Sequence, residues 1–402
     1  MSKNKFITIF LLLIACVLGL GAGGLGMIYL SLPNTESVEG EINAENNKVI
    51  TSSLATGVST TSGELSVHFL ELGNKFTGDC TYIKVGENVD ILIDCGSKSS
   101  SIPYVESYLR NYVTDNTLEY VIVTHAHTDH YAGFATSSSK DGIFDLFYCD
   151  TIIYFSQTET GKRDKSTYKK FENKLNNARK NEAGDYAKKV TALDCIKEEN
   201  GGQKIFTLDE ANNVKLEILD SIYYHEADAT NENNNSVCCL IRHGEDREFL
   251  FTGDLEEDGE EELISRNPTL PKVELYKAGH HGSGTSSTSN FLAKVLDPAN
   301  PAIICVCCCA GSSEYSDNVE KQFPTVQFIN NISKYTTLVY VTTLCLDYKN
   351  NKFKSFNGNI VISSAETVTV SCSDNNDLLK DSTWFKENRL ALCGNSLHES
   401  WK

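Results

Sequence analysis

The chain has 402 residues, of which 40% are apolar, so it is long enough for one large domain or two medium ones with a proper core. Its formal net charge is −18, which argues against broad electrostatic capture of nucleic acid, because phosphate binding usually needs a basic face. This charge does not exclude a nuclease, since metal ions and a local basic patch can offset the repulsion.

An uncharged stretch near the N-terminus, residues 6–30, is rich in Leu, Ile and Gly and follows two lysines. It is long enough to span a bilayer, and the lysines favour a cytoplasmic N-terminus with the rest of the chain outside. A competing signal is the lipobox-like sequence at 13–16, which would be cut before Cys16 and lipidated there. We predict a signal anchor or lipoprotein signal over 1–30, and hence a cell-membrane location with an extracellular catalytic part. A freely secreted form is the third alternative.

Residues 31–63 are mostly Asn, Ser, Thr, Glu and Gly without apolar periodicity, which predicts a flexible linker. A domain follows, which we place over 64–370, and its mixed strand and helix patterns are typical of a layered α/β fold. Residues 371–402 would form a C-terminal appendage, to which the sequence assigns no role. Strands are expected at 65–72, 81–85, 89–96, 120–123, 216–219, 236–241, 248–251, 273–278, 302–307, 338–341 and 358–362, and helices at 102–112, 131–134, 256–262 and 291–296.

Three imidazoles and a carboxylate lie within six positions of the chain, at His125, His127, Asp129 and His130. An expected buried strand precedes them and an expected helix follows, so they occupy a strand-to-helix turn. Neutral imidazole nitrogens and carboxylate oxygens are ligands of borderline divalent metals such as Zn²⁺. The cluster therefore predicts metal binding, with a histidine turn that binds no metal as the alternative.

A basic insert over 156–200 contrasts with the acidic rest of the chain, because ten Lys and Arg residues gather between 162 and 189. The stretch is polar and prone to form helices. We interpret it either as a solvated helical face or as an arm that meets an anionic substrate through residues such as Lys169 and Lys170.

Two later strand ends also carry side chains that can bind metal. Asp254 follows the expected strand 248–251, and a carboxylate in that place can bridge two cations. His280 and His281 follow the strand 273–278, beside glycines that allow close approach of the backbone.

The fourteen cysteines include the pair at 238–239 and the run Cys305-Val306-Cys307-Cys308-Cys309. Vicinal cysteines rarely fit a disulfide framework, and most of these lie in apolar, strand-like runs. We interpret most of them as small buried residues, with a metal cluster at 305–309 as the alternative.

Four motifs now stand in order, at 91–96, 125–130, 251–254 and 279–283. Together they resemble the metallo-β-lactamase family, and within it the extracytoplasmic domain of ComEC-type competence proteins. The resemblance covers about 65–370. It implies an αββα sandwich with two divalent metal ions, Zn or Mn, bound at its edge.

The resemblance also implies a ligand set. The first metal would be held by His125 and His127. The second would be held by Asp129 and His130, with Asp254 bridging the two ions. Either His280 or His281 would complete the second site, and we favour His280 because it directly ends the strand. Asp94 would orient the His cluster through hydrogen bonds.

Two features depart from the family pattern. The usual Gly-Gln-Gly-Asp turn after the first strand is replaced by a longer loop without the Gln, residues 73–79. The family also supplies a third His to the first metal, and His225 is the only His between the cluster and the hairpin. Asn234 or Asn235 is the alternative oxygen donor, and the first site would then suit Mn²⁺ better than Zn²⁺.

We therefore expect an extracytoplasmic metal-dependent phosphodiesterase that acts on nucleic acid. The alternatives are phosphodiesterase activity on an envelope polymer of the phosphorylcholine or teichoic acid type, and a metal-bound surface module without turnover. β-Lactam hydrolysis is disfavoured.

Several residues have expected roles in this reaction. Asp129 would steer the proton of the nucleophile, and His281 would protonate the leaving group or bind a phosphate oxygen. Ser283 and Asn235 would contact the anionic substrate. The membrane is an expected partner through the N-terminal segment, and no protein partner is inferred.

Overall fold

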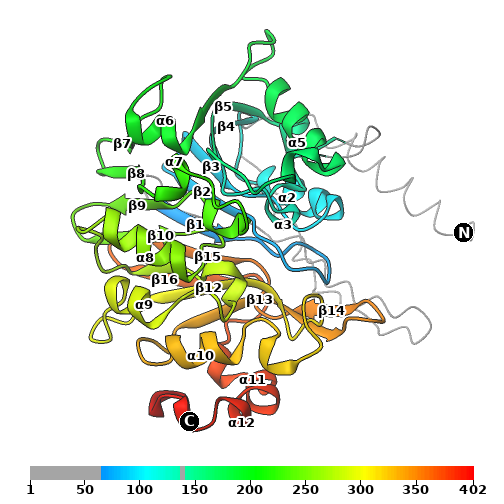
Figure 1. The fold of residues 1–402 in the computed structure, drawn as a ribbon, viewed down its shortest axis with the longest axis vertical. Helices are drawn as coiled ribbons and strands as arrows, with labels where there is room; N and C mark the ends of the chain where they lie inside the picture. The colour runs from blue at the N-terminus through cyan, green and yellow to red at the C-terminus, as the bar shows by residue number, and fades with distance from the viewer. Residues whose placement is uncertain (1–64, 136–140) are drawn as a thin grey trace, which may run out of the picture. The chain divides into compact units, whose positions relative to one another are not determined.

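The computed structural model describes residues 65–135 and 141–402, which form a mixed α/β domain with two eight-stranded sheets (Figure 1). The first sheet has the strand order β16(Val368–Cys372), β15(Ile360–Ser364), β1(Leu65–Phe69), β2(Thr81–Val85), β3(Val89–Ile93), β4(Thr117–Val123), β5(Tyr148–Tyr154), β6(Lys188–Thr191). The second has the order β14(Lys352–Ser355), β13(Val339–Asp347), β12(Ile303–Ala310), β11(Leu275–Lys277), β10(Arg247–Phe251), β9(Cys239–His243), β8(Val214–Ile218), β7(Ile205–Asp209).

Each sheet contains antiparallel and parallel parts. Strands β3 to β6 are parallel in the first sheet, and β10 to β13 are parallel in the second. The carboxyl ends of parallel neighbours lie at the same edge of a sheet, where α/β proteins commonly place their sites. The predicted motifs follow β3, β4, β10 and β11, so the topology gathers them at such edges.

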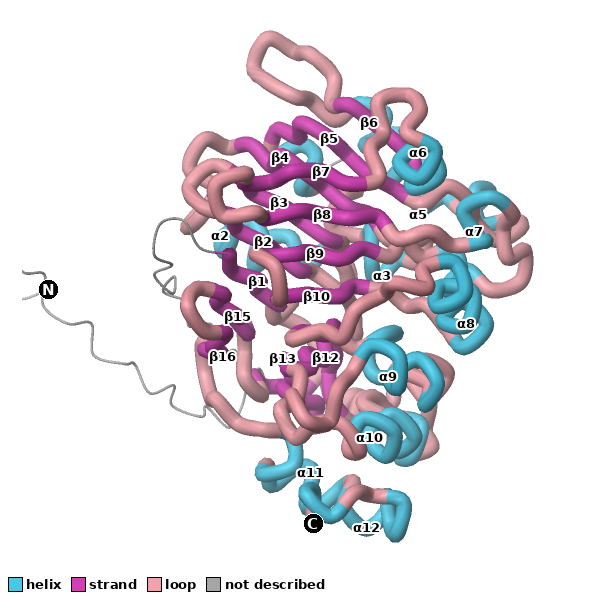
Figure 2. Tube along the Cα trace, turned by 90° about the vertical axis from the view of Figure 1, so that its left-hand side faces the viewer, coloured by secondary structure: helices cyan, strands magenta, loops and turns pink. Residues whose placement is uncertain are grey.

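The two sheets pack face to face, as the tube in Figure 2 shows. Their inner faces share one apolar core, in which the ring centroids of Phe69 and Phe251 from opposite sheets are 6.4 Å apart. A second core lies between the second sheet and helices on its other side, with Leu263, Phe291 and Phe328 fully buried. Burial of large apolar side chains on both faces explains why the central strands are near-continuous apolar runs.

The helices are short. Those that pack on the first sheet include α2(Ile102–Leu109), α3(Thr128–Tyr131), α4(Ile143–Leu146) and α5(Ser166–Asn177). The others are α6(Ala192–Lys197), α7(Ile222–His225), α8(Glu257–Arg266), α9(Ser289–Val295), α10(Val326–Ile332), α11(Thr383–Asn388) and α12(Leu390–Cys393). The expected helix at 131–134 is only the single turn α3, because Gly133 N turns back to donate to Cys95 O.

Two expected segments look different in the structure. The basic insert over 156–200 is not purely helical, because β6 extends the first sheet beside β5. The expected appendage over 371–402 begins inside β16, and its Phe385 and Trp401 are buried in the second core.

The predicted N-terminal anchor, the linker and Cys16 lie outside the described residues. Within 65–135 and 141–402, no helix is both long and apolar enough to cross a bilayer.

The thirteen described cysteines are all free thiols. Successive side chains of a strand point to opposite faces, so Cys307 enters the first core and Cys308 the second. The alternative of a metal cluster at 305–309 is therefore wrong, because these thiols cannot converge on one ion.

Glu71, which follows β1, links the two sheets through its carboxylate. It accepts hydrogen bonds from Ser355 Oγ of β14 at 2.7 Å and from Thr343 Oγ1 of β13 at 3.3 Å. Burial raises the pKa of Glu71 from 4.5 to about 7. The folded protein therefore binds a proton that the unfolded chain releases, and this contribution to stability is lost as the pH rises from about 4.5 to 7.

We expect Glu71→Gln to become more stable relative to the wild type as the pH is raised. The full shift of the Glu71 pKa corresponds to about 3 kcal/mol in the free energy of unfolding. We expect a smaller difference of roughly 1–2 kcal/mol, because the side chain keeps some contact with solvent. Denaturant unfolding at pH 4.5 and pH 8 would measure this difference, with the exposed Glu182→Gln as control. A constant difference between Glu71→Gln and the wild type at both pH values would contradict the assignment.

Candidate metal centre

Asp94 holds the His cluster from behind. It follows β3 with a φ of 57°, which aims its carboxylate at the end of β4. One oxygen accepts from Thr124 N at 2.8 Å, and the other lies 2.7 Å from both Thr124 Oγ1 and His130 Nδ1. Because Nδ1 of His130 is engaged in this way, its Nε2 is directed forward and lies 3.0 Å from Asp254 Oδ2.

Asp254 reaches the cluster through a turn that requires glycine. Gly253 has a φ of 57°, and a Cβ there would come within 2.8 Å of Ser236 Oγ. The hydroxyl of Ser236 accepts from Asp254 N at 3.2 Å and fixes the turn. The carboxylate of Asp254 is thereby buried among the imidazoles.

His281 approaches the same carboxylate from the second sheet. Its Nδ1 lies 2.9 Å from Cys307 O and 3.3 Å from Asp79 Oδ1. Its Nε2 lies 3.3 Å from Asp254 Oδ2 and 3.6 Å from Asp129 Oδ2. His281 therefore repeats the arrangement of His130, with one ring nitrogen held from behind and the other facing Asp254.

The residues Asp79, His130, Asp254 and His281 form a group that fits a divalent cation. One ligand atom from each lies within 4.8 Å of all the others, and all four residues are buried. Asp79 Oδ1, Asp254 Oδ1 and His281 Nε2 are buried without a hydrogen-bond partner. Buried polar atoms are normally satisfied, and this nitrogen and oxygen donor set suits Zn²⁺ or Mn²⁺.

A second pair of donors lies beside this group. His125 Nε2 and His127 Nδ1 are 3.0 Å apart, and His125 Nε2 is 4.0 Å from Asp254 Oδ2. His280 lies near the same carboxylate, with its Nε2 3.9 Å from Asp254 Oδ2. Side chains from distant strand ends therefore surround a single carboxylate.

The charges of the site favour cations. Burial lowers the pKa of His125 well below its usual value. Burial would also lower the pKa of His130, but the carboxylates of Asp254 and Asp94 outweigh it and raise this pKa well above normal. Burial would raise the pKa of Asp254, but His130 and His281 hold it well below its usual range. A crowd of ionised carboxylates in a buried site is stabilised by bound positive charge.

The two histidines of the 279–283 turn have different surroundings. Both adopt left-handed backbone conformations, with φ of 46° for His280 and 56° for His281. The side chain of His281 is 1% exposed, whereas that of His280 is 21% exposed and lies 3.2 Å from Glu256 Oε1. The geometry thus favours His281 over His280 as the ligand, although the sequence favoured His280.

The structure does not bring every predicted residue to the centre. His225 ends α7, where its Nε2 lies 3.3 Å from Asp220 Oδ1, so its ring is paired away from the cluster. The amide of Asn235 is bonded to the backbone of Asp228, and Asn234 Oδ1 accepts from Glu256 N. The third donor to the first metal therefore stays unassigned.

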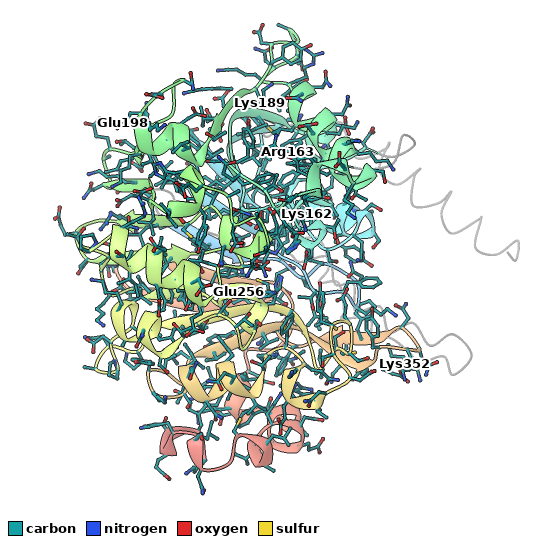
Figure 3. The ribbon with its side chains drawn as sticks, viewed as in Figure 1. Lys162, Arg163, Lys189, Glu198, Glu256 and Lys352 are labelled. Carbon is teal, nitrogen blue, oxygen red and sulfur yellow. The ribbon has the colours of Figure 1, made fainter. Side chains whose placement is uncertain are left out.

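The substrate residues expected from the sequence lie in two places. Ser283 is close to the centre, with its hydroxyl 2.9 Å from Thr285 Oγ1. Lys169 and Lys170 are exposed on α5. From the same basic insert, Lys162 (Figure 3) lies close enough to His127 that its charge helps to lower the pKa of that ring.

Sequence reasoning missed three residues of the centre. Asp79 is backed by Lys277, whose Nζ lies 2.5 Å from Asp79 Oδ2, and Tyr315 OH donates to Asp129 Oδ2 at 3.0 Å. The Gly-Asp at the end of the 73–79 loop was a usable signal for Asp79. Lys277 resembles any residue at the end of a strand, and Tyr315 lies in an irregular loop after β12, so neither carries a signal in the sequence.

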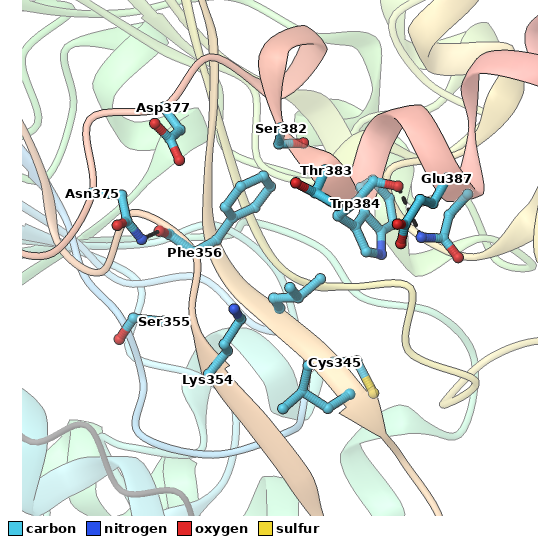
Figure 4. A pocket seen from close by; sticks show the side chains of 13 residues that line it. Cys345, Lys354, Ser355, Phe356, Asn375, Asp377, Ser382, Thr383, Trp384 and Glu387 are labelled. Atoms are coloured by element: carbon cyan, nitrogen blue, oxygen red, sulfur yellow. Dashed lines mark hydrogen bonds between the residues drawn. The ribbon is translucent and has the colours of Figure 1, made fainter. Parts of the chain in front are cut away.

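A pocket of about 490 Å³ lies elsewhere, between the β13–β14 hairpin and α11 (Figure 4). Its lining includes Lys354, Trp384 and Glu387, and none of the imidazoles contributes to it. The histidine cluster is therefore the candidate functional site because its buried metal-type side chains lie close together, and not because it has a large cavity.

Comparison with known proteins agrees with this geometry. Residues 73–143 match the family model of the metallo-beta-lactamase superfamily. A stretch of 68 residues is 34% identical to ComE operon protein 3 of Bacillus subtilis (strain 168), and this match covers 17% of the chain and 8% of that protein.

Two solved structures are similar at low sequence identity. The metallo-beta-lactamase fold protein YhfI from Bacillus subtilis is 14% identical, with 75% of this chain and 100% of that chain covered and a TM-score of 0.38. A long form RNase Z from yeast is 13% identical, with 73% and 39% covered and a TM-score of 0.37. The family match includes the loop of Asp79 and the whole His125–His130 cluster. Residues 73–143 are therefore the part of the chain that is similar to the metallo-beta-lactamase superfamily at the level of sequence.

Proposed function

We propose that the protein is a metal-dependent phosphodiesterase that acts on nucleic acid outside the cytoplasm. The observation that carries this proposal is the convergence of His125, His130 and His281 on the buried carboxylate of Asp254, with His127 beside His125. Divalent cations held by these residues would activate a water molecule and stabilise the charge that develops on the phosphate.

The residues around the ligands have distinct tasks. Asp94 holds Nδ1 of His130 and the carbonyl of Cys307 holds Nδ1 of His281, which fixes each ring and its tautomer. Asp129 faces the open side, since its side chain is 17% exposed, and Tyr315 OH holds its Oδ2. Asp129 is therefore placed to accept the proton of the attacking water.

The geometry favours an exchange of the roles predicted for the two turn histidines. His281 is enclosed and suits a ligand, whereas His280 is partly exposed and carries Glu256 against its Nδ1. We propose that His280 contacts the scissile phosphate or protonates the leaving group. Ser283, Lys162, Lys169 and Lys170 remain candidates for contact with the anionic chain of the substrate.

The predicted membrane anchor also supports a second candidate, a phosphodiesterase of envelope polymers. The third candidate is a metal-bound surface module without turnover. We expect the full-length chain to release p-nitrophenol from bis-p-nitrophenyl phosphate when Mn²⁺ or Zn²⁺ is added, and to lose this activity in EDTA. No release despite bound metal would favour the surface module. Cleavage of single-stranded DNA, compared with release of choline, would then separate the two enzyme candidates.

A further inference from the structure

The long loop between β1 and β2, which departs from the family pattern, packs against a distant hairpin. The ring of Phe76 meets that of Tyr348, in the turn between β13 and β14, with centroids 6.2 Å apart at 87°. Lys75 Nζ lies 4.1 Å from the centroid of the Tyr348 ring and donates to Tyr348 O at 2.7 Å. Lys98 Nζ lies 4.7 Å from the centroid of the Phe76 ring. The loop therefore presents two rings and two ammonium groups together.

A second pair of rings begins at the metal centre itself. The centroid of Phe323 lies 5.8 Å from that of His280 and 6.0 Å from that of His281. The ring of Tyr315 lies 5.6 Å from Phe323, and Tyr315 is 57% exposed. This exposed ring continues the row of rings that starts at the two turn histidines.

A hydrogen bond from a backbone amide to a side-chain carboxylate joins the two pairs. Thr77 N, next to Phe76, donates to Oε2 of Glu314, next to Tyr315, at 2.8 Å. In Figure 1 the blue loop between β1 and β2 extends toward the orange β13–β14 hairpin, in agreement with the contact between Phe76 and Tyr348. We name the resulting strip the aromatic ridge: Phe76, Tyr315, Phe323 and Tyr348, with Lys75 and Lys98.

The charge of the ridge stands out in an acidic chain. Among the described residues, no carboxylate lies within ion-pair distance of the ammonium groups of Lys75 and Lys98. Lys75 covers one face of the Tyr348 ring and Lys98 one face of the Phe76 ring. A flexible polyanion with flat bases would match this arrangement if its bases stacked on the opposite ring faces and its phosphates met the ammonium groups. An envelope polymer of polyol phosphates has no aromatic rings that could stack, so only its phosphates would contribute to binding, by pairing with the lysines.

We propose that the aromatic ridge binds the unpaired bases and phosphates of a single-stranded nucleic acid as the strand leaves the metal centre. This inference rests on the proposed phosphodiesterase function. The bases next to the scissile bond would stack on the rings of Tyr315 and Phe323. Bases further along the strand would stack on the rings of Phe76 and Tyr348. The ammonium groups of Lys75 and Lys98 would pair with the phosphates between these bases.

The test uses full-length protein and two readouts. The first is the Kd of a fluorescein-labelled oligothymidylate, measured by anisotropy in EDTA, so that no turnover occurs. The second is kcat/KM for bis-p-nitrophenyl phosphate, a small ester without bases or further phosphates. We expect Phe76→Ala and Tyr348→Ala each to weaken oligonucleotide binding about tenfold, with the small-ester activity unchanged. In Lys75→Ala/Lys98→Ala, the slope of log Kd against log salt should fall by about 1.4.

Tyr186→Ala is the matched control, because Tyr186 is also exposed and carries Arg179 and Lys189 over its ring, but belongs to the basic insert. Unchanged oligonucleotide binding in both ridge variants would overturn the proposal, as would a loss confined to Tyr186→Ala. If the wild type hydrolyses the small ester but binds no oligonucleotide, the proposed binding by the aromatic ridge is wrong. The proposed phosphodiesterase activity would not be affected by that result. A wild type that binds the oligonucleotide through the ridge but hydrolyses nothing would instead refute the proposed activity.

Discussion

Asp254→Asn is expected to empty the metal centre and to stop hydrolysis of bis-p-nitrophenyl phosphate. The Oδ2 atom of Asp254 lies 3.0 Å from His130 Nε2, 3.3 Å from His281 Nε2 and 4.0 Å from His125 Nε2. An amide of the same shape carries no charge and cannot bridge two cations. Loss of residues that merely orient ligands weakens metal binding by about 10–100-fold, so loss of this central ligand should exceed 100-fold.

The measurements for this variant are metal content per chain after dialysis and the steady-state rate with added Mn²⁺ or Zn²⁺. We expect the rate to fall by at least about 10³-fold, the upper range for loss of one preorganised electrostatic group. Asp220→Asn is the control, since Asp220 pairs with His225 outside the centre. If Asp254→Asn kept its bound metal and a tenth of the wild-type hydrolysis rate, the active site would have to lie elsewhere in the protein.

Lys277→Met is expected to destabilise the metal-free protein by about 3–5 kcal/mol, the cost of removing one member of a buried ion pair. Lys277 Nζ lies 2.5 Å from Asp79 Oδ2, and their side chains are 4% and 2% exposed. The ammonium also donates to Ala278 O at 3.1 Å. Without it, the carboxylate of Asp79 would be a buried charge whose strongest compensating partner is gone.

Denaturant unfolding in EDTA would measure this loss. The double variant Lys277→Met/Asp79→Asn should recover much of it, because no unpaired charge then remains. Lys272→Met serves as control, since the exposed ammonium of Lys272 contacts only the carbonyls of Ala293 and Leu296. Equal stability of Lys277→Met and the wild type would mean that Asp79 is not ionised in the folded protein.

Much of the fold and the site could be predicted because metal-type residues stand at the ends of apolar strands. The His125–His130 cluster follows β4 and Asp254 follows β10. In the parallel part of one sheet such ends share one edge, which brings Asp254 after β10 close to His281 after β11. The meeting of this edge with the end of β4 follows from the packing of the two sheets.

The remaining parts of the site depend on tertiary contacts that sequence patterns do not encode. The choice between His280 and His281 is made by two consecutive left-handed residues and by the carbonyl of Cys307. Lys277 could not be told from an ordinary strand residue, yet its partner Asp79 comes from a loop nearly 200 positions earlier. His225 has a suitable residue type and place in the chain, but α7 turns its ring toward Asp220.

The donors of the centre are divided between the two sheets. The first sheet brings Asp79, just before β2, and His130, after β4, and the second brings Asp254 and His281. A chain in which only one sheet has formed would present half of the donors and would hold a cation weakly. Binding of a cation at this centre would therefore require both sheets to be in place.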